Sequence, residues 1–246
     1  MKDFVYDEMY RNEAEFWWFK ARRKIILDKI EQIVSDKKDV KILDAGCGCG
    51  YILQFLQRYG EVFGMDFSPK AIEYTKSHFD GVVKKGDLNG EIPFEDNSFD
   101  IIISLDVLEH VEKDDIALQS LHRVLKSGGK CILTVPAHKF LWSYHDHNHM
   151  HIRRYEKKEF EDKLKAANFN ITYLTWFDAW LYIPVVIIRM IKEHIINTKD
   201  MASDGRMPGK IMNRILYNIF ASESWFIKRN IRFMQGVSLL AVIDKE

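Results

Sequence analysis

The alternation of short apolar runs with helical patterns over residues 40–178 is the feature that most constrains this chain. The apolar runs have the length of strands, and the segments between them repeat apolar residues at helical spacing. Strands that alternate with helices need crossover connections, which are right-handed, so the strands run mostly parallel and helices cover both faces of the sheet. The sequence therefore predicts an α/β fold.

The individual elements follow from the same patterns. We expect strands at 40–45, 61–66, 81–87, 99–106, 130–137, 170–177 and 236–246. We expect helices at 15–34, 51–60, 68–79, 114–126 and 157–169, and two aromatic and basic helical segments at 180–192 and 211–233, joined by a turn-rich stretch at 201–209. Ser68 is the predicted cap of the third helix and Gly128 closes the fourth.

Composition limits the classes of function. Lys plus Arg and Asp plus Glu both total 36, so no overall field attracts the chain to nucleic acid, and we expect no nucleic-acid partner. The N-terminus is charged from its second residue and lacks the apolar stretch of a secretory signal, which predicts a cytoplasmic protein. Three cysteines are too few for a disulfide framework.

A glycine turn and an aspartate that follows the next strand suggest a ligand site. The turn DAGCGCG at 44–50 leaves the backbone open to a ligand, but Tyr51 stands where a dinucleotide-binding G-x-G-x-x-G pattern needs its third glycine. Asp66 ends the second strand, where a carboxylate can accept hydrogen bonds from a ribose diol. Its alternative role is that of a turn aspartate before Ser68.

The motifs taken together resemble those of the class I S-adenosylmethionine-dependent methyltransferases. The resemblance covers nearly all of residues 40–178 and is carried in order by VKILDAGCGCG, GMDFSPKAIEYTK, KKGDLN, FEDNSFDIIISLDVLEHV and LHRVLKSGGKCILTVPA. It implies a Rossmann-like doubly wound, seven-stranded, mostly parallel sheet whose last strand is antiparallel. We expect one domain over 1–246, made of an N-terminal helical cap (1–36), a core that binds the cofactor (37–178), a helical insertion that covers the acceptor site (179–233) and a final strand (234–246).

The resemblance also implies which residues bind S-adenosylmethionine and its product S-adenosylhomocysteine. Asp44 would face the amino group, Asp66 the ribose, Asp87 the adenine N6 amine and Leu105 the sulfonium. The remaining predicted cofactor residues are Ala45, Gly46 and Gly48 along the methionine part, and Phe67 and Leu88 against adenine. The segment FWWFKARRK resembles a helix of one branch, in which Trp18 would cover the cofactor and Arg22 meet its carboxylate; packing and solvation are the alternatives.

The histidine-rich stretch WSYHDHNHMHIRRY at 142–155 is the candidate acceptor site. In the same branch an aspartate, a histidine and Arg-Arg-Tyr recur at the spacing of Asp146, His151 and Arg153. His151 would act as general base oriented by Asp146, Arg153 or Arg154 would hold an anionic part of the acceptor, and His110 is a second candidate.

Two other interpretations of this stretch remain open. Alternate histidines of an extended segment, at 145, 147, 149 and 151, could share one side and bind a metal, although a sulfonium donor needs no zinc, and we expect no metal ligand. A polar lid with an ion pair between Asp146 and Arg154 is the other interpretation.

These expectations predict methyl transfer to an oxygen or nitrogen of a small or amphiphilic acceptor, such as a glycan, a lipid-linked molecule or a secondary metabolite. A non-catalytic cofactor-binding sensor or interaction module is the alternative, and a nucleotide-dependent oxidoreductase is disfavoured by Tyr51. The apolar run at 180–188 is too short for the ~20 residues that span a bilayer. Residues 180–192 either cap the sheet or contact a membrane surface, and in the second case the predicted cytoplasmic protein is membrane-associated.

Overall fold

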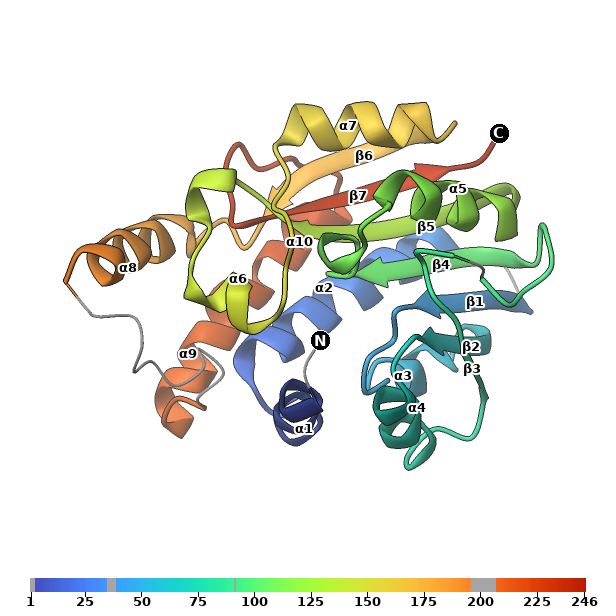
Figure 1. The fold of residues 1–246 in the computed structure, drawn as a ribbon. Helices are drawn as coiled ribbons and strands as arrows, with labels where there is room; N and C mark the ends of the chain where they lie inside the picture. Colours follow the sequence, from blue (N-terminus) through green and yellow to red (C-terminus); the bar gives the residue numbers. More distant parts are fainter. Residues whose placement is uncertain (1–2, 35–38, 91, 196–206) are drawn as a thin grey trace.

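The computed structural model describes residues 3–34, 39–90, 92–195 and 207–246 (Figure 1). It contains one seven-stranded sheet in the order β3-β2-β1-β4-β5-β7-β6. The strands are β1 (Val40–Ala45), β2 (Gly60–Asp66), β3 (Val82–Lys85), β4 (Phe99–Leu105), β5 (Leu125–Pro136), β6 (Asn170–Phe177) and β7 (Ser238–Asp244).

The strand directions agree with the predicted fold class. The first five strands pair in parallel, as in Leu43 opposite Ile102 between β1 and β4, whereas β7 lies antiparallel between β5 and β6. The Rossmann-like, mostly parallel sheet with an antiparallel last strand is therefore confirmed. All five parallel strands end at the same edge of the sheet, on the left in Figure 1.

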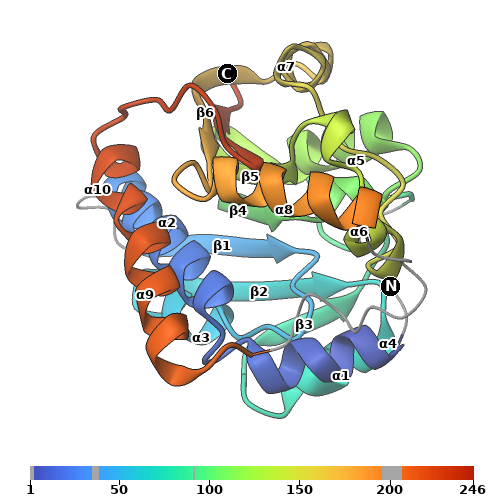
Figure 2. The ribbon, with the colours of Figure 1, turned by 90° about the vertical axis from the view of Figure 1, so that its left-hand side faces the viewer.

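Two layers of helices cover the sheet (Figure 2). One core joins the sheet to α2 (Trp17–Val34), α3 (Leu53–Leu56), α9 (Lys210–Ala221) and α10 (Glu223–Lys228), and the other joins it to α5 (Asp114–Val124) and α7 (Lys157–Ala166). The short elements η1 (Leu108–His110), η2 (Lys139–Leu141) and α6 (Tyr144–Asn148) follow β4 and β5. Helix α1 (Asp3–Asn12) packs on α4 (Pro69–Lys76), where Tyr10 and Tyr74 stack with ring centroids 4.2 Å apart.

The predicted insertion is divided between two places. Helices α9 and α10 pack along α2, whereas α8 (Tyr182–Ile195) lies at the carboxyl edge of the strands (Figure 2). Part of the predicted linker at 201–209 lies outside the described residues. Within the part of the chain that the structure describes, no helix is both long and apolar enough to cross a membrane.

Three local expectations were wrong. The helix expected at 51–60 is only the single turn α3. The helix expected at 114–126 ends at Val124, because the chain turns directly into β5 and passes through Gly128 with φ +72°. The histidine stretch is not extended: Ser143 and Asp146 form a capping box that starts the helical turn α6.

Candidate functional site

A cavity of about 810 Å³ opens at the carboxyl edge of the parallel strands. It is enclosed by α1, the start of α2, the loops after β1, β2 and β4, the histidine stretch and α8. Most of the predicted site residues line it: Trp18, Arg22, Gly46, Gly48, Asp66, Phe67, Asp87, Leu88, Leu105, His110 and His151. Asp44, Ala45, Asp146 and Arg153 do not line it.

The glycine turn presents bare backbone to this cavity. Gly46 and Gly48 have φ of +91° and +56°, a conformation that favours glycine. A Cβ atom on Gly46 would lie 2.5 Å from a methyl carbon of Val107, so no larger residue fits there. The turn is thus a cradle that an extended ligand can approach closely, as the methionine part of the cofactor requires.

Asp66 holds this cradle and faces the cavity. Its two carboxylate oxygens accept hydrogen bonds from the backbone N–H groups of Gly48 and Ser68, both at 2.9 Å. The side chain is buried, and burial raises the pKa of the Asp66 carboxyl. The hydrogen bond from Ser68 is that of the expected turn aspartate, while the role of Asp66 as a ribose ligand stays a prediction. Phe67 stands beside it, 49% exposed.

A second group of charges lies under the glycine turn. Asp44 lines a smaller cavity of about 40 Å³ together with Glu13 and Arg22. Burial raises the pKa of Asp44 to about 8, against the opposing charge of Arg22. Arg22 stacks on Trp18 at 4.5 Å and forms an ion pair with Asp106, so it is not a solvated arginine.

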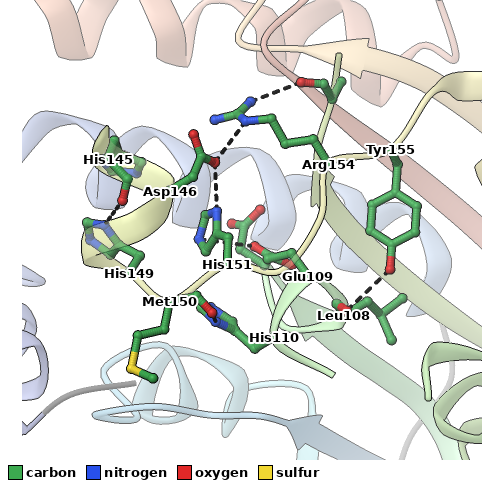
Figure 3. Close-up of polar contacts among 12 residues, drawn as sticks. Leu108, Glu109, His110, His145, Asp146, His149, Met150, His151, Arg154 and Tyr155 are labelled. Carbon is green, nitrogen blue, oxygen red and sulfur yellow. Dashed lines mark hydrogen bonds and ion pairs between the residues drawn. The ribbon is translucent and has the colours of Figure 1, made fainter. Parts of the chain in front are cut away.

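The acceptor end of the cavity is built around the buried Asp146 (Figure 3). One of its carboxylate oxygens accepts hydrogen bonds from Nδ1 of His151 at 2.9 Å and from Nε of the buried Arg154 at 2.8 Å. Burial acts to raise the pKa of Asp146, but the hydrogen bond from His151 and the charge of Arg154 hold it below its usual range. Asp146 therefore both orients His151 and forms the ion pair with Arg154.

His110 belongs to the same group, and Arg153 does not. The ring of His110 lies edge-on to that of His151 at 4.8 Å, and burial lowers the pKa of His110 to about 3. Arg153 instead pairs with Asp114 at 2.7 Å and donates to the carbonyl of Glu112 at 2.9 Å. Adjacent residues of this segment diverge, which leaves Arg153 outside the cavity lining.

The four alternate histidines do not share one side, because α6 is helical. The ring centroids of His145 and His149 lie 4.1 Å apart and about 6 Å from that of His151, whereas His147 points elsewhere and accepts a hydrogen bond from the Trp142 indole at 3.0 Å. Among the described residues, the group that could hold a metal ion is a different one, made of Glu109, His110 and His151.

Glu109 is a cavity residue that the sequence reasoning missed. It is fully buried, and neither carboxylate oxygen has a hydrogen-bond partner among the described residues. Burial, with a contribution from Asp106, raises the pKa of Glu109 well above its usual value. The available signal was an acidic residue inside the apolar segment VLEHV, directly before the candidate His110.

Comparison with known proteins finds that part of this chain is similar to methyltransferases. The family described as "Methyltransferase domain" matches residues 43–133. The chain is 30% identical over 148 residues to the ubiquinone biosynthesis O-methyltransferase of Pelagibacter ubique, which covers 50% of this chain and 60% of that protein. It is 32% identical over 134 residues to the demethylmenaquinone methyltransferase of Staphylococcus aureus. That match covers 52% of this chain and 54% of that protein. The matches thus span little more than half of each relative.

A solved structure supports the same fold over the whole chain. The TehB-like S-adenosylmethionine-dependent methyltransferase of Corynebacterium glutamicum superposes with a TM-score of 0.60 at 21% identity, and covers 99% of this chain and 98% of that one. The bare glycine turn and the buried carboxylate of Asp66 fit the donor that such proteins use. Residues 43–133 thus match a methyltransferase domain, and the fold of the whole chain is that of the class I S-adenosylmethionine-dependent methyltransferases.

Proposed function

We propose that this chain transfers a methyl group from S-adenosylmethionine to an oxygen or nitrogen of a small or amphiphilic acceptor. One observation carries the proposal: a single cavity joins the glycine turn and Asp66 at one end to His110 and His151 at the other. A methyl donor and an acceptor held in one cavity can be aligned for in-line transfer, which is most of what a sulfonium donor needs.

The cofactor end is assigned by the family resemblance together with the cavity lining. Asp66 would accept the ribose hydroxyl groups and Asp87 the adenine N6 amine, while Phe67 and Leu88 would lie against the adenine ring. Asp44 would face the amino group through the smaller cavity. Trp18 and the Arg22 that stacks on it would cover the methionine part and meet its carboxylate. Leu105, from the end of β4, would lie below the sulfonium.

At the acceptor end, His151 would take up the proton that the acceptor loses. The bound sulfonium would supply the methyl group, and Nε2 of His151 would accept the proton from the acceptor atom. The hydrogen bond to Asp146 keeps Nδ1 protonated and leaves Nε2 free to accept. His110 would pack beside the acceptor.

The cavity wall supports an acceptor with apolar parts. Phe16 just before α2, Trp17 at its start, and Val185 and Ile188 from α8 line it. The names of the two relatives above refer to ubiquinone and menaquinone, both small molecules. We include glycan, lipid-linked and secondary-metabolite acceptors in the proposal.

We also propose that α8 brings the cavity to an anionic membrane surface. Ile183, Ile187, Met190 and Ile191 are exposed on this helix, and Ile188 is both exposed and part of the cavity lining. The sequence of α9 adds Lys210 and Arg214 without any acidic residue, a charge pattern that suits anionic lipid headgroups. An amphiphilic acceptor could then enter from the bilayer.

Calorimetric titration with S-adenosylhomocysteine tests the cofactor end. Asp66→Ala should weaken binding about 10–100-fold, because a hydrogen bond to a charged group is worth roughly 1.5–3 kcal/mol. Asp80→Ala, on an exposed residue outside the cavity lining, should bind as the unaltered chain does. Unchanged affinity in Asp66→Ala would remove Asp66 as the ribose ligand.

The non-catalytic alternative is tested by transfer itself. Incubation with S-adenosylmethionine carrying a labelled methyl group and a panel of quinol, glycan and lipid-linked acceptors should label one class. His151→Gln should bind S-adenosylhomocysteine normally and lose most of the transfer. Tight cofactor binding without labelling of any acceptor class would favour a sensor or interaction module.

A further inference from the structure

We propose that Glu109, His110 and His151 bind one divalent transition-metal cation at the acceptor end of the cavity. This inference differs from our sequence-based expectation of no metal ligand. It rests on the mutual distances of the three side chains, on the hydrogen bonds behind the two histidines and on the unpartnered carboxylate of Glu109. Its catalytic part rests on the proposed function, but cation binding itself does not.

The three side chains present their ligand atoms to one point. One atom from each lies within 4.8 Å of the others, and Nε2 of His151 lies 3.9 Å from Oε1 of Glu109. All three residues line the cavity. Glu109 and His110 come from η1 after β4, and His151 comes from the segment after α6 (Figure 3). A small closing movement would bring the atoms to the distances of about 2.0–2.2 Å at which such ligands hold a cation.

The hydrogen bonds behind each histidine leave Nε2 free. Nδ1 of His151 faces a carboxylate oxygen of Asp146 at 2.9 Å, and Nδ1 of His110 faces the carbonyl of Met150 at 3.3 Å. Both oxygens can only accept, so each Nδ1 carries the proton and each Nε2 keeps its lone pair. Histidines that bind metals are oriented by this kind of contact to a carboxylate or a backbone carbonyl.

The support behind His151 is itself rigid. Asp146 is fully buried, and it accepts from Arg154 at 2.8 Å and from the backbone N–H of Ser143 at 2.9 Å. The backbone N–H of Ile152 donates to the carbonyl of Glu109 at 2.9 Å, which ties the histidine segment to η1. The two segments that supply the ligands are therefore held together before any ligand binds.

Glu109 supplies the independent observation. It is fully buried and lines the cavity, yet neither of its carboxylate oxygens has a hydrogen-bond partner among the described residues. A buried carboxylate is costly unless it is paired with a cation or a hydrogen-bond donor. A cation held with the two Nε2 atoms would supply the missing partner.

The donor set indicates the class of metal. Two imidazole nitrogens and one carboxylate oxygen suit Zn²⁺, Mn²⁺, Fe²⁺ or Co²⁺, whereas Mg²⁺ and Ca²⁺ favour all-oxygen sites. Three protein ligands leave a position for an acceptor oxygen. A cation lowers the pKa of a hydroxyl group that it binds, so in the loaded protein it would take over the activation that His151 provides in the metal-free chain.

The test is titration of the metal-stripped protein with Co²⁺, followed by visible absorption, and with Zn²⁺, followed by calorimetry. We expect one equivalent to bind. Glu109→Gln and His151→Gln should each weaken binding at least about tenfold, the lower limit seen even when only a supporting residue is lost. His147→Gln, on a histidine of the same stretch whose ring nitrogen contacts Trp142, should bind as the unaltered chain does.

Titration of each variant with S-adenosylhomocysteine, without metal, checks that the cavity is intact and tests the proposed function separately. No binding of either cation by the unaltered protein would overturn the metal site. Binding by Glu109→Gln and His151→Gln as tight as in the unaltered chain would also overturn it, since the cation would then lie elsewhere. Neither result would affect the assignment of the methyl donor.

Discussion

Asp44 has its carboxyl group enclosed below the glycine turn, where burial raises its pKa to about 8. In the cofactor-free chain it therefore carries a proton at neutral pH. The cofactor's ammonium group would favour the ionised form of Asp44. Below pH 8, Asp44 must therefore lose its proton when the cofactor binds. This removal costs about 1.4 kcal/mol for each pH unit below the pKa.

We therefore predict that the affinity for S-adenosylhomocysteine rises between pH 6 and pH 8, by up to about tenfold per pH unit. Asp44→Asn should bind weakly, with little dependence on pH. Glu13 is the other nearby acid that could cause such a pH dependence, because burial raises its pKa to about 7. Glu13→Gln therefore serves as the control and should keep most of the rise in affinity with pH. Calorimetry across this range measures all three proteins, and a flat profile for the unaltered chain would contradict the prediction.

At the scale of single residues, the sequence predicted which side chains line the cavity better at the strand ends than in the histidine stretch. Asp66 is the last residue of β2 and Asp87 lies two residues after β3, and the ends of parallel strands meet at one edge of the sheet whatever the details of packing. Glu109 and His151 are far apart in the chain, and their segments meet through long-range contacts, such as the hydrogen bond from Ile152 to Glu109 and that between His110 and Met150. No local pattern could reveal those contacts.

At the scale of helices and strands, the bounds set by local patterns were predicted, and those set by long-range contacts were missed. Strand β6 begins and ends where its alternating pattern predicted, and α2 follows the predicted amphipathic helix closely. The boundary between α5 and β5 was missed because Leu125 pairs with Phe99 in the sheet. Leu125 fits the apolar spacing of the expected helix, but this pairing makes it the first residue of β5. Helix α6 was missed because its capping box competes with the alternation of the histidines.

Helix α8 carries the prediction that belongs to this scale. Ile183 is 66% exposed and Ile187 51% exposed, one helical turn apart. We expect the protein to sediment with vesicles of anionic phospholipid, and Ile187→Glu to lower the bound fraction by more than half, because it places a charge in the apolar stripe.

Val82→Glu is the matched control for this experiment, because Val82 is also exposed but lies on β3 at the far edge of the sheet. It should leave vesicle binding unchanged. Equal loss in both variants would indicate a general effect of negative charge, and no loss in Ile187→Glu would remove α8 as the membrane contact.

At the scale of the whole molecule, several buried carboxyl groups join elements that are distant in the sequence. Glu223 of α10 accepts hydrogen bonds from the backbone N–H groups of Ala179 and Trp180, at 2.7 and 3.0 Å, and so fixes the chain ahead of α8. Burial raises the pKa of Glu223 to about 8 and that of Asp178 beside it to about 7. The packing of α10 against the chain before α8 thus involves acids whose protonated form is favoured by burial.

This arrangement makes stability depend on pH in a defined direction. An acid whose pKa is raised on folding holds a proton that the unfolded chain releases, so its contribution is complete below its ordinary pKa and is lost as the pH rises toward the folded value. Histidines with lowered pKa, such as His110, act in the opposite direction, but only below about pH 6.5. Between pH 7 and pH 8 the acids dominate, and the free energy of unfolding should fall.

Glu223→Gln should reduce this fall by about 1 kcal/mol between pH 7 and pH 8, because glutamine keeps an acceptor for the two N–H groups but does not titrate. Urea unfolding of the cofactor-free protein at several pH values measures the slope. Glu95→Gln, which changes an exposed glutamate, should follow the unaltered chain throughout. If the free energy of unfolding of Glu223→Gln fell with pH in parallel to that of the unaltered chain, the proton on Glu223 would not be the cause of the pH dependence.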